Sequence, residues 1–461
     1  MGWSDGPKGG LILRIRATLL TLTVVATSLV LMTPSLAGHG NFEASFPAQE
    51  QGADFAGVAS NASDDSNAPD SFAPCVRGMA AGTYPCDRVD MMSRVPREEL
   101  GLSFVNDIWG WTDPATKNDY ALIGGTEGTV IVDIGDPKRP DVVGILPAHT
   151  LDPNRPFWRD IKVYADHMFV VSEQTGHGMQ VFDLTEVRGV TGEPVVFEET
   201  AHYANFSNSH NLNINTDTGY AYAVGSNTCA GGLHMVDITD PTSPGFAGCF
   251  DEHGYIHDTQ CVVYEGPDAN YRGREICFSA NAQPHHDDPD GTTNTLSIVD
   301  VTDKGNPVPV ARMEYANDGY SHQGWLAPGQ EYFLHGDELD EVNRGLNTTT
   351  RVWDVRDLDN PDVILVWEND TTSIDHNLYT EGGVTYQSNY TSGLRVLDSS
   401  KVGVPELSEI AFFDVYPEND NATFEGGTWS NYPYFRQKKI VAVSSIDRGL
   451  FVLRPRGGGG N

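Results

Sequence analysis

The sequence predicts an all-β fold, a seven-bladed β-propeller, and three observations support this prediction. From residue 103 onward, a pattern of four short β-rich segments recurs about every 50 residues, a period typical of propeller blades. The third segment alternates apolar and polar residues and ends in Asp in six of the seven copies. The composition, 39% hydrophobic residues with 48 Gly and 27 Pro, suits a folded β protein with many turns.

Each copy begins with a segment that we expect to form the innermost strand of a blade. The copies begin at Asn106, Arg159, His210, His257, His322, His376 and Trp429. The third strands end at Asp133, Asp183, Asp237, Asp300, Asp354 and Asp398, and the seventh copy has residues 450–453 in this place. One four-stranded sheet cannot bury both of its faces, so the sheets are expected to stack around a common axis.

Closure of the ring is a separate prediction. The seventh copy ends after its third strand, near Leu453, so its fourth strand has to come from elsewhere in the chain. Residues 89–95 precede the first copy and alternate in polarity. We predict that they form the outer strand of blade seven and so remove the open seam between the first and last blades.

The N-terminal residues 1–37 are typical of a secretory signal peptide. Lys8, Arg14 and Arg16 precede an uncharged apolar run, residues 17–32, and small residues stand at the cleavage positions of Ser35-Leu36-Ala37. A membrane anchor is the alternative, but a run of about 16 residues is short for a helix that needs about 20 to span a bilayer. We therefore expect cleavage near Ala37, no stable membrane span in the mature form, and a protein secreted to the extracellular space or periplasm.

The remaining chain divides into three parts. Residues 38–74 are rich in Ala, Ser, Asn, Asp and Gly, which predicts a flexible leader. Residues 75–456 hold the propeller, and residues 457–461 are a Gly-rich tail. We expect the mature protein to be a monomer.

Net charge excludes two classes of partner. The chain has 29 Lys and Arg against 64 Asp and Glu, a formal charge of −35. Such a field repels polyanions, which argues against nucleic acid and against anionic lipid surfaces as partners. The expected partner is instead a small molecule, a protein or a glycan.

Six cysteines, an even number, agree with an oxidising compartment. Six cysteines allow fifteen pairings. Proximity along the chain suggests three disulfides, and they are Cys75–Cys86, Cys229–Cys249 and Cys261–Cys277.

Several motifs resemble the choice-of-anchor B family, exported proteins that carry LVIVD-type repeats. One example is Gly176-His177-Gly178-Met179-Gln180-Val181-Phe182-Asp183. The others are residues 75–80 and 84–86, 106–111, 158–162, 231–235 and 321–325. The resemblance extends from about Cys75 to Pro455 and implies a secreted or surface-held propeller. It brings no established activity.

Four consecutive copies begin with His, namely His210, His257, His322 and His376. Inner strands line the channel of a propeller, so these side chains are expected to converge at one axial mouth as ligands for zinc, copper or iron. Glu173 is a candidate general base for a metal-bound water, and Arg159 is a candidate for binding an acidic substrate group. Further residues expected at this ligand mouth are Asp107, Asp160, His177, Asn227, Asn281, Asp337, Glu338 and Asn389.

Structural roles remain open for the same residues. Each His could bond to the backbone of the next blade, and Arg159 could neutralise Asp160 or Glu173. However, the copies that begin with Asn106, Arg159 and Trp429 break the pattern, which favours a site over a blade signature. Five tryptophans near the inner strands are expected to pack as wedges between blades rather than to form a stacking platform. They are Trp109, Trp111, Trp158, Trp325 and Trp429.

Two acidic segments are candidate calcium sites at surface loops, with solvated loops as the alternative. They are residues 285–291 and 337–341. The function predicted from the sequence is an exported propeller whose polar, His-rich axial mouth binds a metal ion or small ligand. The alternative is a non-catalytic extracellular module that binds protein or glycan and has structural histidines. An enzyme on this scaffold would be a metal-dependent hydrolase, lyase or oxidase.

Overall fold

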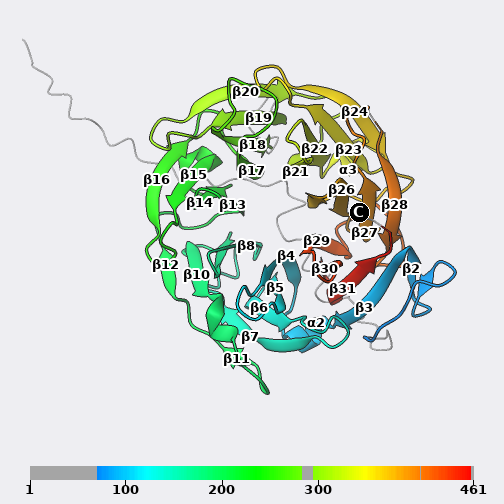
Figure 1. Ribbon diagram of the computed structural model, residues 1–461. Helices are drawn as coiled ribbons and strands as arrows, with labels where there is room; N and C mark the ends of the chain where they lie inside the picture. Colours follow the sequence, from blue (N-terminus) through cyan, green and yellow to red (C-terminus); the bar gives the residue numbers. More distant parts are fainter. Residues whose placement is uncertain (1–69, 283–293, 405, 458–461) are drawn as a thin grey trace, which may run out of the picture. The chain divides into compact units, whose positions relative to one another are not determined.

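The computed structural model describes residues 70–282, 294–404 and 406–457. The predicted signal peptide, the leader up to residue 69, the acidic loop at 285–291 and residues 458–461 lie outside the described residues. Within the described ranges the chain forms seven sheets, which stand around a central channel (Figure 1). The predicted all-β, seven-bladed propeller is confirmed.

The blades follow one another along the chain, with the first strand of each innermost. Blade one is β4 (Val105–Thr112), β5 (Asp119–Gly125), β6 (Gly128–Asp133) and β7 (Asp141–Pro147). Blade two is β8 (Arg159–Tyr164), β9 (His167–Ser172), β10 (Met179–Asp183) and β12 (Ala201–Tyr203). Blade three is β13 (Asn211–Asn215), β14 (Tyr220–Val224), β15 (Leu233–Asp237) and β16 (Gly245–Phe250). Blade four is β17 (Asp258–Val263), β18 (Glu275–Asn281), β19 (Thr295–Asp300) and β20 (Val308–Glu314).

The last three blades repeat this order. Blade five is β21 (Ser321–Leu326), β22 (Tyr332–Asp337), β23 (Thr349–Asp354) and β24 (Asp362–Glu368). Blade six is β25 (Leu378–Glu381), β26 (Val384–Ser388), β27 (Leu394–Asp398) and β28 (Ser408–Phe413), extended at its edge by β2 (Tyr84–Asp87) and β1 (Met79–Ala80). Blade seven is β29 (Thr428–Phe435), β30 (Ile440–Ser445), β31 (Gly449–Pro455) and β3 (Val89–Val95).

Strand β3 closes the ring, as the sequence predicts. It pairs antiparallel with β31, in a register that places Val89 opposite Pro455 and Val95 opposite Leu450. The residues before β1 lie beside β3, because Ala73 and Met91 form an isolated antiparallel bridge with backbone hydrogen bonds of 2.9 and 3.0 Å. The end of the segment assigned to the leader therefore lies against the propeller.

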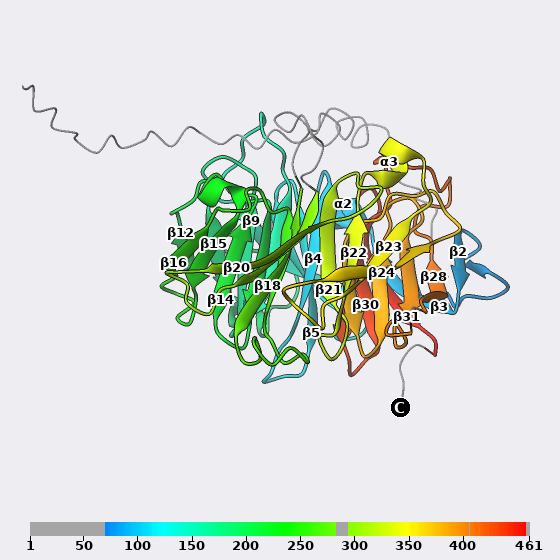
Figure 2. The same cartoon turned by 90° about the horizontal axis from the view of Figure 1, so that it is seen from above.

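Short elements lie in the connections between strands, most of them within single blades. Helices α2 (Arg97–Leu100) and α3 (Asp340–Arg344) and the 3₁₀ turns η1 (Leu184–Val187) and η2 (Cys229–Gly231) lie between strands, and α3 sits at one face of the propeller (Figure 2). Strand β11 (Val195–Val196) belongs to the segment between β10 and β12 of blade two, but it pairs in parallel with β7 of blade one. No helix in the described ranges is long and apolar enough to cross a bilayer.

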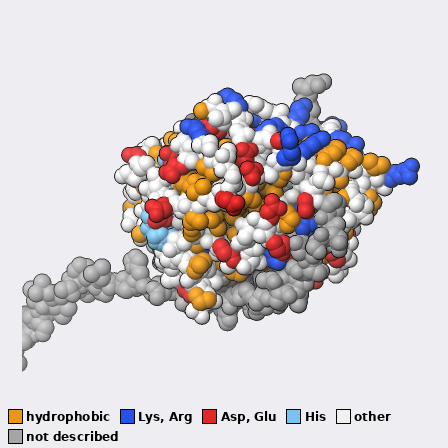
Figure 3. Space-filling view, turned by 90° about the horizontal axis from the view of Figure 1, so that it is seen from below, with side chains coloured by type: hydrophobic (Ala, Val, Ile, Leu, Met, Phe, Trp, Pro, Cys, Tyr) orange, Lys and Arg blue, Asp and Glu red, His pale blue; other side chains and the backbone are white. Residues whose placement is uncertain are grey.

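The hydrophobic core is divided among the gaps between neighbouring blades. Phe169 and Val181 of blade two, for example, pack on Leu212 and Ala221 of blade three, and all four side chains are fully buried. Burial of one sheet against the next supplies the apolar contacts that a single sheet lacks. Charged side chains of both signs are spread over the side of the ring, with apolar side chains between them (Figure 3).

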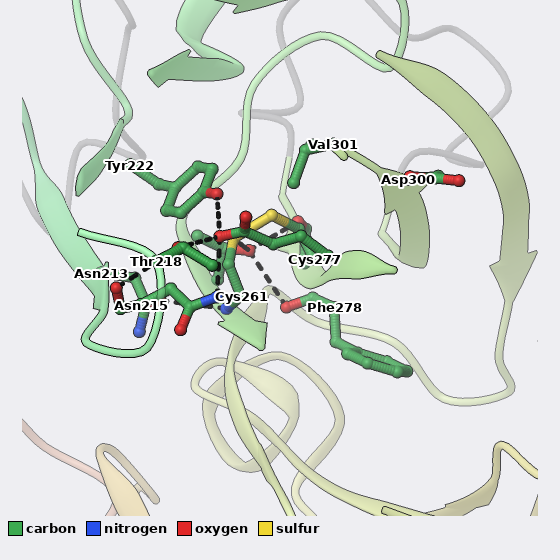
Figure 4. Close-up of a disulfide and its surroundings, with 12 residues drawn as sticks. Asn213, Asn215, Thr218, Tyr222, Cys261, Cys277, Phe278, Asp300 and Val301 are labelled. Atoms are coloured by element: carbon green, nitrogen blue, oxygen red, sulfur yellow. Dashed lines mark hydrogen bonds between the residues drawn. A yellow bond between two sulfur atoms is a disulfide. The ribbon is translucent and has the colours of Figure 1, made fainter. Parts of the chain in front are cut away.

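The three predicted disulfides are confirmed. Cys75–Cys86 ties the segment before β1 to β2, and Cys229–Cys249 ties η2 to β16. Cys261–Cys277 links the directly paired strands β17 and β18 (Figure 4). The six cysteines are thereby accounted for.

Candidate metal centre in the axial channel

A belt of side-chain acceptors ties the inner strands of adjacent blades. Five times, a carboxylate or amide oxygen on one inner strand accepts the backbone N–H of the next. The pairs are Asp107 with Ile161, Asp160 with Leu212, Asn213 with Cys261, Gln260 with Leu326 and Gln323 with Leu378. The bond from Cys261 to Asn213 is drawn in Figure 4. This belt ties neighbouring inner strands together with side chains other than those of the four histidines.

Lys162 lies inside the channel, and sequence reasoning missed it. Its ammonium nitrogen is 2.5 Å from Asp160 Oδ1 and 3.8 Å from Asp107 Oδ2. Burial lowers the pKa of Lys162, but the charges of Asp160, Asp107 and Asp258 outweigh it, so the pKa is raised. Burial and the charge of Asp160 raise the pKa of Asp258 to about 7. Lys162 is therefore a second basic residue on the inner strands, in addition to Arg159. It is Lys162 that neutralises Asp160.

The four histidines form a continuous row around the channel. The ring centroids of successive histidines, from His210 through His257 and His322 to His376, are 4.2, 4.2 and 4.3 Å apart. Their exposed fractions are only 7%, 1%, 2% and 5%. The four histidines stand where the inner strands of blades three to six begin, so the ring of blades brings their imidazoles together, as the repeat pattern predicts.

Two of these imidazoles are oriented by the next blade. His257 Nδ1 donates to the backbone oxygen of His322 at 2.8 Å, and His376 Nδ1 donates to the backbone oxygen of Trp429. This is the bond that the structural alternative foresaw. It also fixes the tautomer in which Nε2 carries the lone pair, the arrangement that metal-ligating histidines adopt.

Burial keeps three of the four histidines neutral. It lowers the pKa of His257 and of His322 well below the usual value, and that of His376 to about 3. Neutral imidazole is the form that binds metal. At His210, burial is outweighed by the hydrogen bond and charge of Glu173, whose Oε1 lies 2.5 Å from Nδ1, so the pKa is raised. His210 and Glu173 therefore form an ion pair at the end of the row.

Glu338 places a carboxylate between two of the neutral histidines. Its Oε2 lies 3.8 Å from His322 Nε2, and its Oε1 lies 3.7 Å from His376 Nε2. Tyr390 donates its hydroxyl to Glu338 Oε1 at 2.7 Å. Ligand atoms of His322, Glu338 and His376 all lie within 4.8 Å of one another. Two imidazoles and a carboxylate are a donor set used by zinc and by non-haem iron.

Aromatic side chains cover this centre. Trp158, Tyr390, Phe424 and Trp429 line the chamber with the histidines, and the free volume is about 10 Å³. That is room for roughly one water-sized sphere. The sequence predicts an open polar mouth, whereas the structure closes this end of the channel with an aromatic roof. Trp158 and Trp429 are packing residues of that roof.

Other candidate site residues have different surroundings. Arg159 donates from Nε to the backbone oxygen of Gly125 at 2.7 Å and lies 2.9 Å from His177 Nε2 through its Nη1. Asn281 donates to the backbone oxygens of His253 and Tyr255. The side chains of Arg159 and Asn281 therefore make hydrogen bonds within the protein.

The last three candidates differ in their exposure to solvent. Asn227 is exposed and accepts the backbone N–H of Ser207 at 2.8 Å. Asn389 is fully buried and directly follows β26. The segment 337–341 is not a solvated loop, because Asp337, Glu338, Asp340 and Glu341 are at most 3% exposed. It folds inward with α3, so a surface loop is the wrong interpretation of its acidity.

A larger cavity of about 430 Å³ lies at the other end of the channel. The histidines stand at the starts of inner strands, whereas this cavity is lined by their later residues. Its aromatic walls are Trp109, Trp325 and Tyr432, and Asn213 and Gln260 add amides. Trp109 packs edge-on against Tyr432 with the ring centroids 5.1 Å apart, so it is both a wedge between blades and part of the cavity wall.

Comparisons with known proteins give a family match and similarity to solved structures. The LVIVD repeat family matches residues 113–146 and 213–252, which cover β5–β7 and β13–β16, so the predicted LVIVD repeats are confirmed. A solved structure of a functionally unknown protein from Desulfotomaculum acetoxidans DSM 771 is 11% identical, with 70% of this chain and 89% of that chain covered and a TM-score of 0.47. No curated protein matches the chain.

Proposed function

We propose that this protein is an exported β-propeller that holds one divalent transition-metal ion in its axial channel. The ligands are Nε2 of His322, Nε2 of His376 and the carboxylate of Glu338. The observation that carries the proposal is the position of Glu338, whose two oxygens each face one neutral, buried imidazole. His257 is the next imidazole in the row.

The distances favour an ion over a direct bond. Separations of 3.7 and 3.8 Å between Glu338 and the two Nε2 atoms are too long for hydrogen bonds. Ligand atoms about 2.0–2.2 Å from a shared zinc ion lie about 3–4 Å apart, which is the spacing found here. Zinc, copper and iron are the candidate metals, and two imidazoles with one carboxylate fit zinc and iron best.

Export is supported by the signal-like residues 1–37 and by the three disulfides, which persist in oxidising compartments. The resemblance to the choice-of-anchor B family points the same way. Since the aromatic roof leaves room for little more than an ion or a water, the geometry favours metal holding over turnover of an organic substrate at this end.

The proposal is tested by elemental analysis of the purified native protein and two variants. We expect about one equivalent of transition metal, and at least a tenfold lower occupancy in H322A and in H376A because each loses a ligand. The matched control is H234Q. His234 is equally buried but is held by Tyr203 and Thr228, so this variant should keep the metal.

A purely structural role makes a different prediction. In that case H322A and H376A would lower stability by about 1–3 kcal/mol through unpaired neighbours, with the metal content unchanged. Absence of stoichiometric metal from the native protein would also refute the proposal.

A second candidate function, recognition of a glycan, is favoured by the cavity of about 430 Å³. Trp109, Trp325 and Tyr432 offer amphipathic rings, and Asn213 and Gln260 offer polar contacts that could orient hydroxyl groups.

Titration calorimetry with a panel of neutral oligosaccharides tests this function. For any sugar that binds, we expect W109A and W325A to weaken the affinity about tenfold or more, because each removes an aromatic wall. The control is W367A, since Trp367 lies on the outer strand β24. Equal binding by all three variants would contradict the assignment of the cavity.

A further inference from the structure

A second group of acids is buried beside the proposed metal centre, on α3 and on the segment that leads into β25. Asp340, Glu341 and Asp375 are 0%, 3% and 1% exposed. One carboxylate oxygen of each lies within 4.8 Å of the others. Three acids from two blades therefore converge on one point inside the protein.

The neighbouring Asp337 shows how a structural carboxylate is satisfied in this region. Its Oδ2 accepts from the N–H of Gly319 at 2.8 Å and from the hydroxyl of Tyr315 at 2.6 Å. Its Oδ1 accepts from the N–H of Tyr320 at 2.6 Å and from that of Leu339 at 3.3 Å. Four donors thus stabilise this one buried charge.

The three convergent acids lack such donors. Among the described residues, neither oxygen of Glu341 and neither oxygen of Asp375 has a hydrogen-bond partner, and Asp340 Oδ1 has none. Asp340 Oδ2 alone is engaged, by Arg351 at 2.8 Å and Thr349 at 2.7 Å. Buried carboxylates require compensation by donors or cations. Arg351 supplies one cation through Asp340 Oδ2, and the five oxygens without a hydrogen-bond partner favour a further positive ligand.

Gly336 on β22 allows one of these carboxylates its position. A Cβ atom at this residue would stand 2.3 Å from Asp375 Oδ2, which is too close for any contact. The carboxylate of Asp375 therefore rests directly against the strand backbone, where a side chain would exclude it.

We infer that Asp340, Glu341 and Asp375 bind a Ca²⁺ ion. The donors are all oxygens, which selects hard cations over the metals that prefer imidazole. Calcium accepts monodentate and bidentate carboxylates at about 2.3–2.6 Å, so oxygens that share it lie up to about 5 Å apart, in agreement with the grouping found. Magnesium usually keeps several waters and is held by one or two carboxylates, whereas here three carboxylates come from the protein. The site is chemically distinct from the centre formed by His322, His376 and Glu338.

The test is Ca²⁺ titration of the purified mature protein after chelation of bound metal, followed by calorimetry and by thermal unfolding. We expect one equivalent to bind with a Kd below about 1 mM and the Tm to rise with Ca²⁺ concentration. E341Q and D375N should weaken binding by about 100-fold or more. Both should also melt above the metal-free native protein, because each removes a buried repulsion; this second readout shows that the variants fold.

Two controls separate this site from other acids. Asp268, Asp357 and Asp359 form a similar group of three, but they are partly or fully exposed, so D359N should leave the Kd for Ca²⁺ unchanged. H322A removes a proposed transition-metal ligand and should also keep Ca²⁺ binding. The inference is overturned if the native protein binds no Ca²⁺, or if E341Q and D375N bind Ca²⁺ as the native protein does.

Discussion

Removal of strand β3 is expected to abolish the folded state. A chain that starts at residue 97 lacks the outer strand of blade seven, including Val89, Met91 and Val95, which are at most 2% exposed. Each buried apolar side chain contributes about 1.5–3 kcal/mol, so their joint loss is comparable with the total stability of a typical domain, about 5–15 kcal/mol. Circular dichroism and thermal unfolding should show no cooperative transition.

Two controls make this prediction specific. A chain that starts at residue 70 keeps β3 and should melt at the temperature of the full chain. M91K places a charge at a fully buried position of β3 and should be strongly destabilising, whereas M79K at the exposed Met79 should have little effect. A cooperative transition at an unchanged Tm in the chain from residue 97 would show that β3 is dispensable.

Replacement of Lys162 by Met is expected to lower the free energy of unfolding by about 3–5 kcal/mol. The substitution removes the cation that faces Asp160 and Asp107 and leaves their carboxylates buried without it. Urea unfolding at pH 7 measures the loss. The double variant K162M/D160N should recover part of it, because the amide keeps an oxygen that can accept the N–H of Leu212.

The pH dependence of this loss has a definite sign. Burial raises the pKa of Asp258 to about 7, so this carboxyl takes up a proton as the pH falls below 7. A protonated acid needs no counter-charge, and the penalty of K162M should therefore shrink from pH 7 to pH 5. The control R436M breaks the exposed pair between Arg436 and Glu381 and should change stability by less than about 1 kcal/mol at either pH. A K162M penalty as small as that of R436M would contradict a role for Lys162 as the buried counter-ion.

The fold could be predicted because its signal is repeated. Seven copies of one strand pattern reinforce one another, and the missing fourth strand of blade seven left residues 89–95 as the segment able to supply it. The disulfide pairs were predictable because each joins cysteines close in sequence. The row of histidines followed from the same periodicity, since equivalent positions in adjacent blades are neighbours in a ring.

The centre itself depends on contacts that have no local signature. His322, Glu338 and His376 come from two blades, and nothing in the sequence shows that both oxygens of Glu338 face imidazoles. The aromatic roof was missed because Tyr390 and Phe424 lie outside the named strands, Tyr390 in an isolated bridge to Thr428 and Phe424 in a bend. The acidic segment 337–341 resembles a solvated loop in composition, but four donors around Asp337 and the packing of α3 turn it inward.

The strand pair that closes the ring also constrains the order of folding. Residues 89–95 are synthesised long before residues 449–455, yet they are partners in one sheet. Strand β3 therefore stays without its partner until all seven blades have been synthesised. Such long-range closure is slow, because the intervening chain must first be ordered. Closure of the ring is therefore expected among the last steps of folding, because blade seven stays incomplete until residues 449–455 are present.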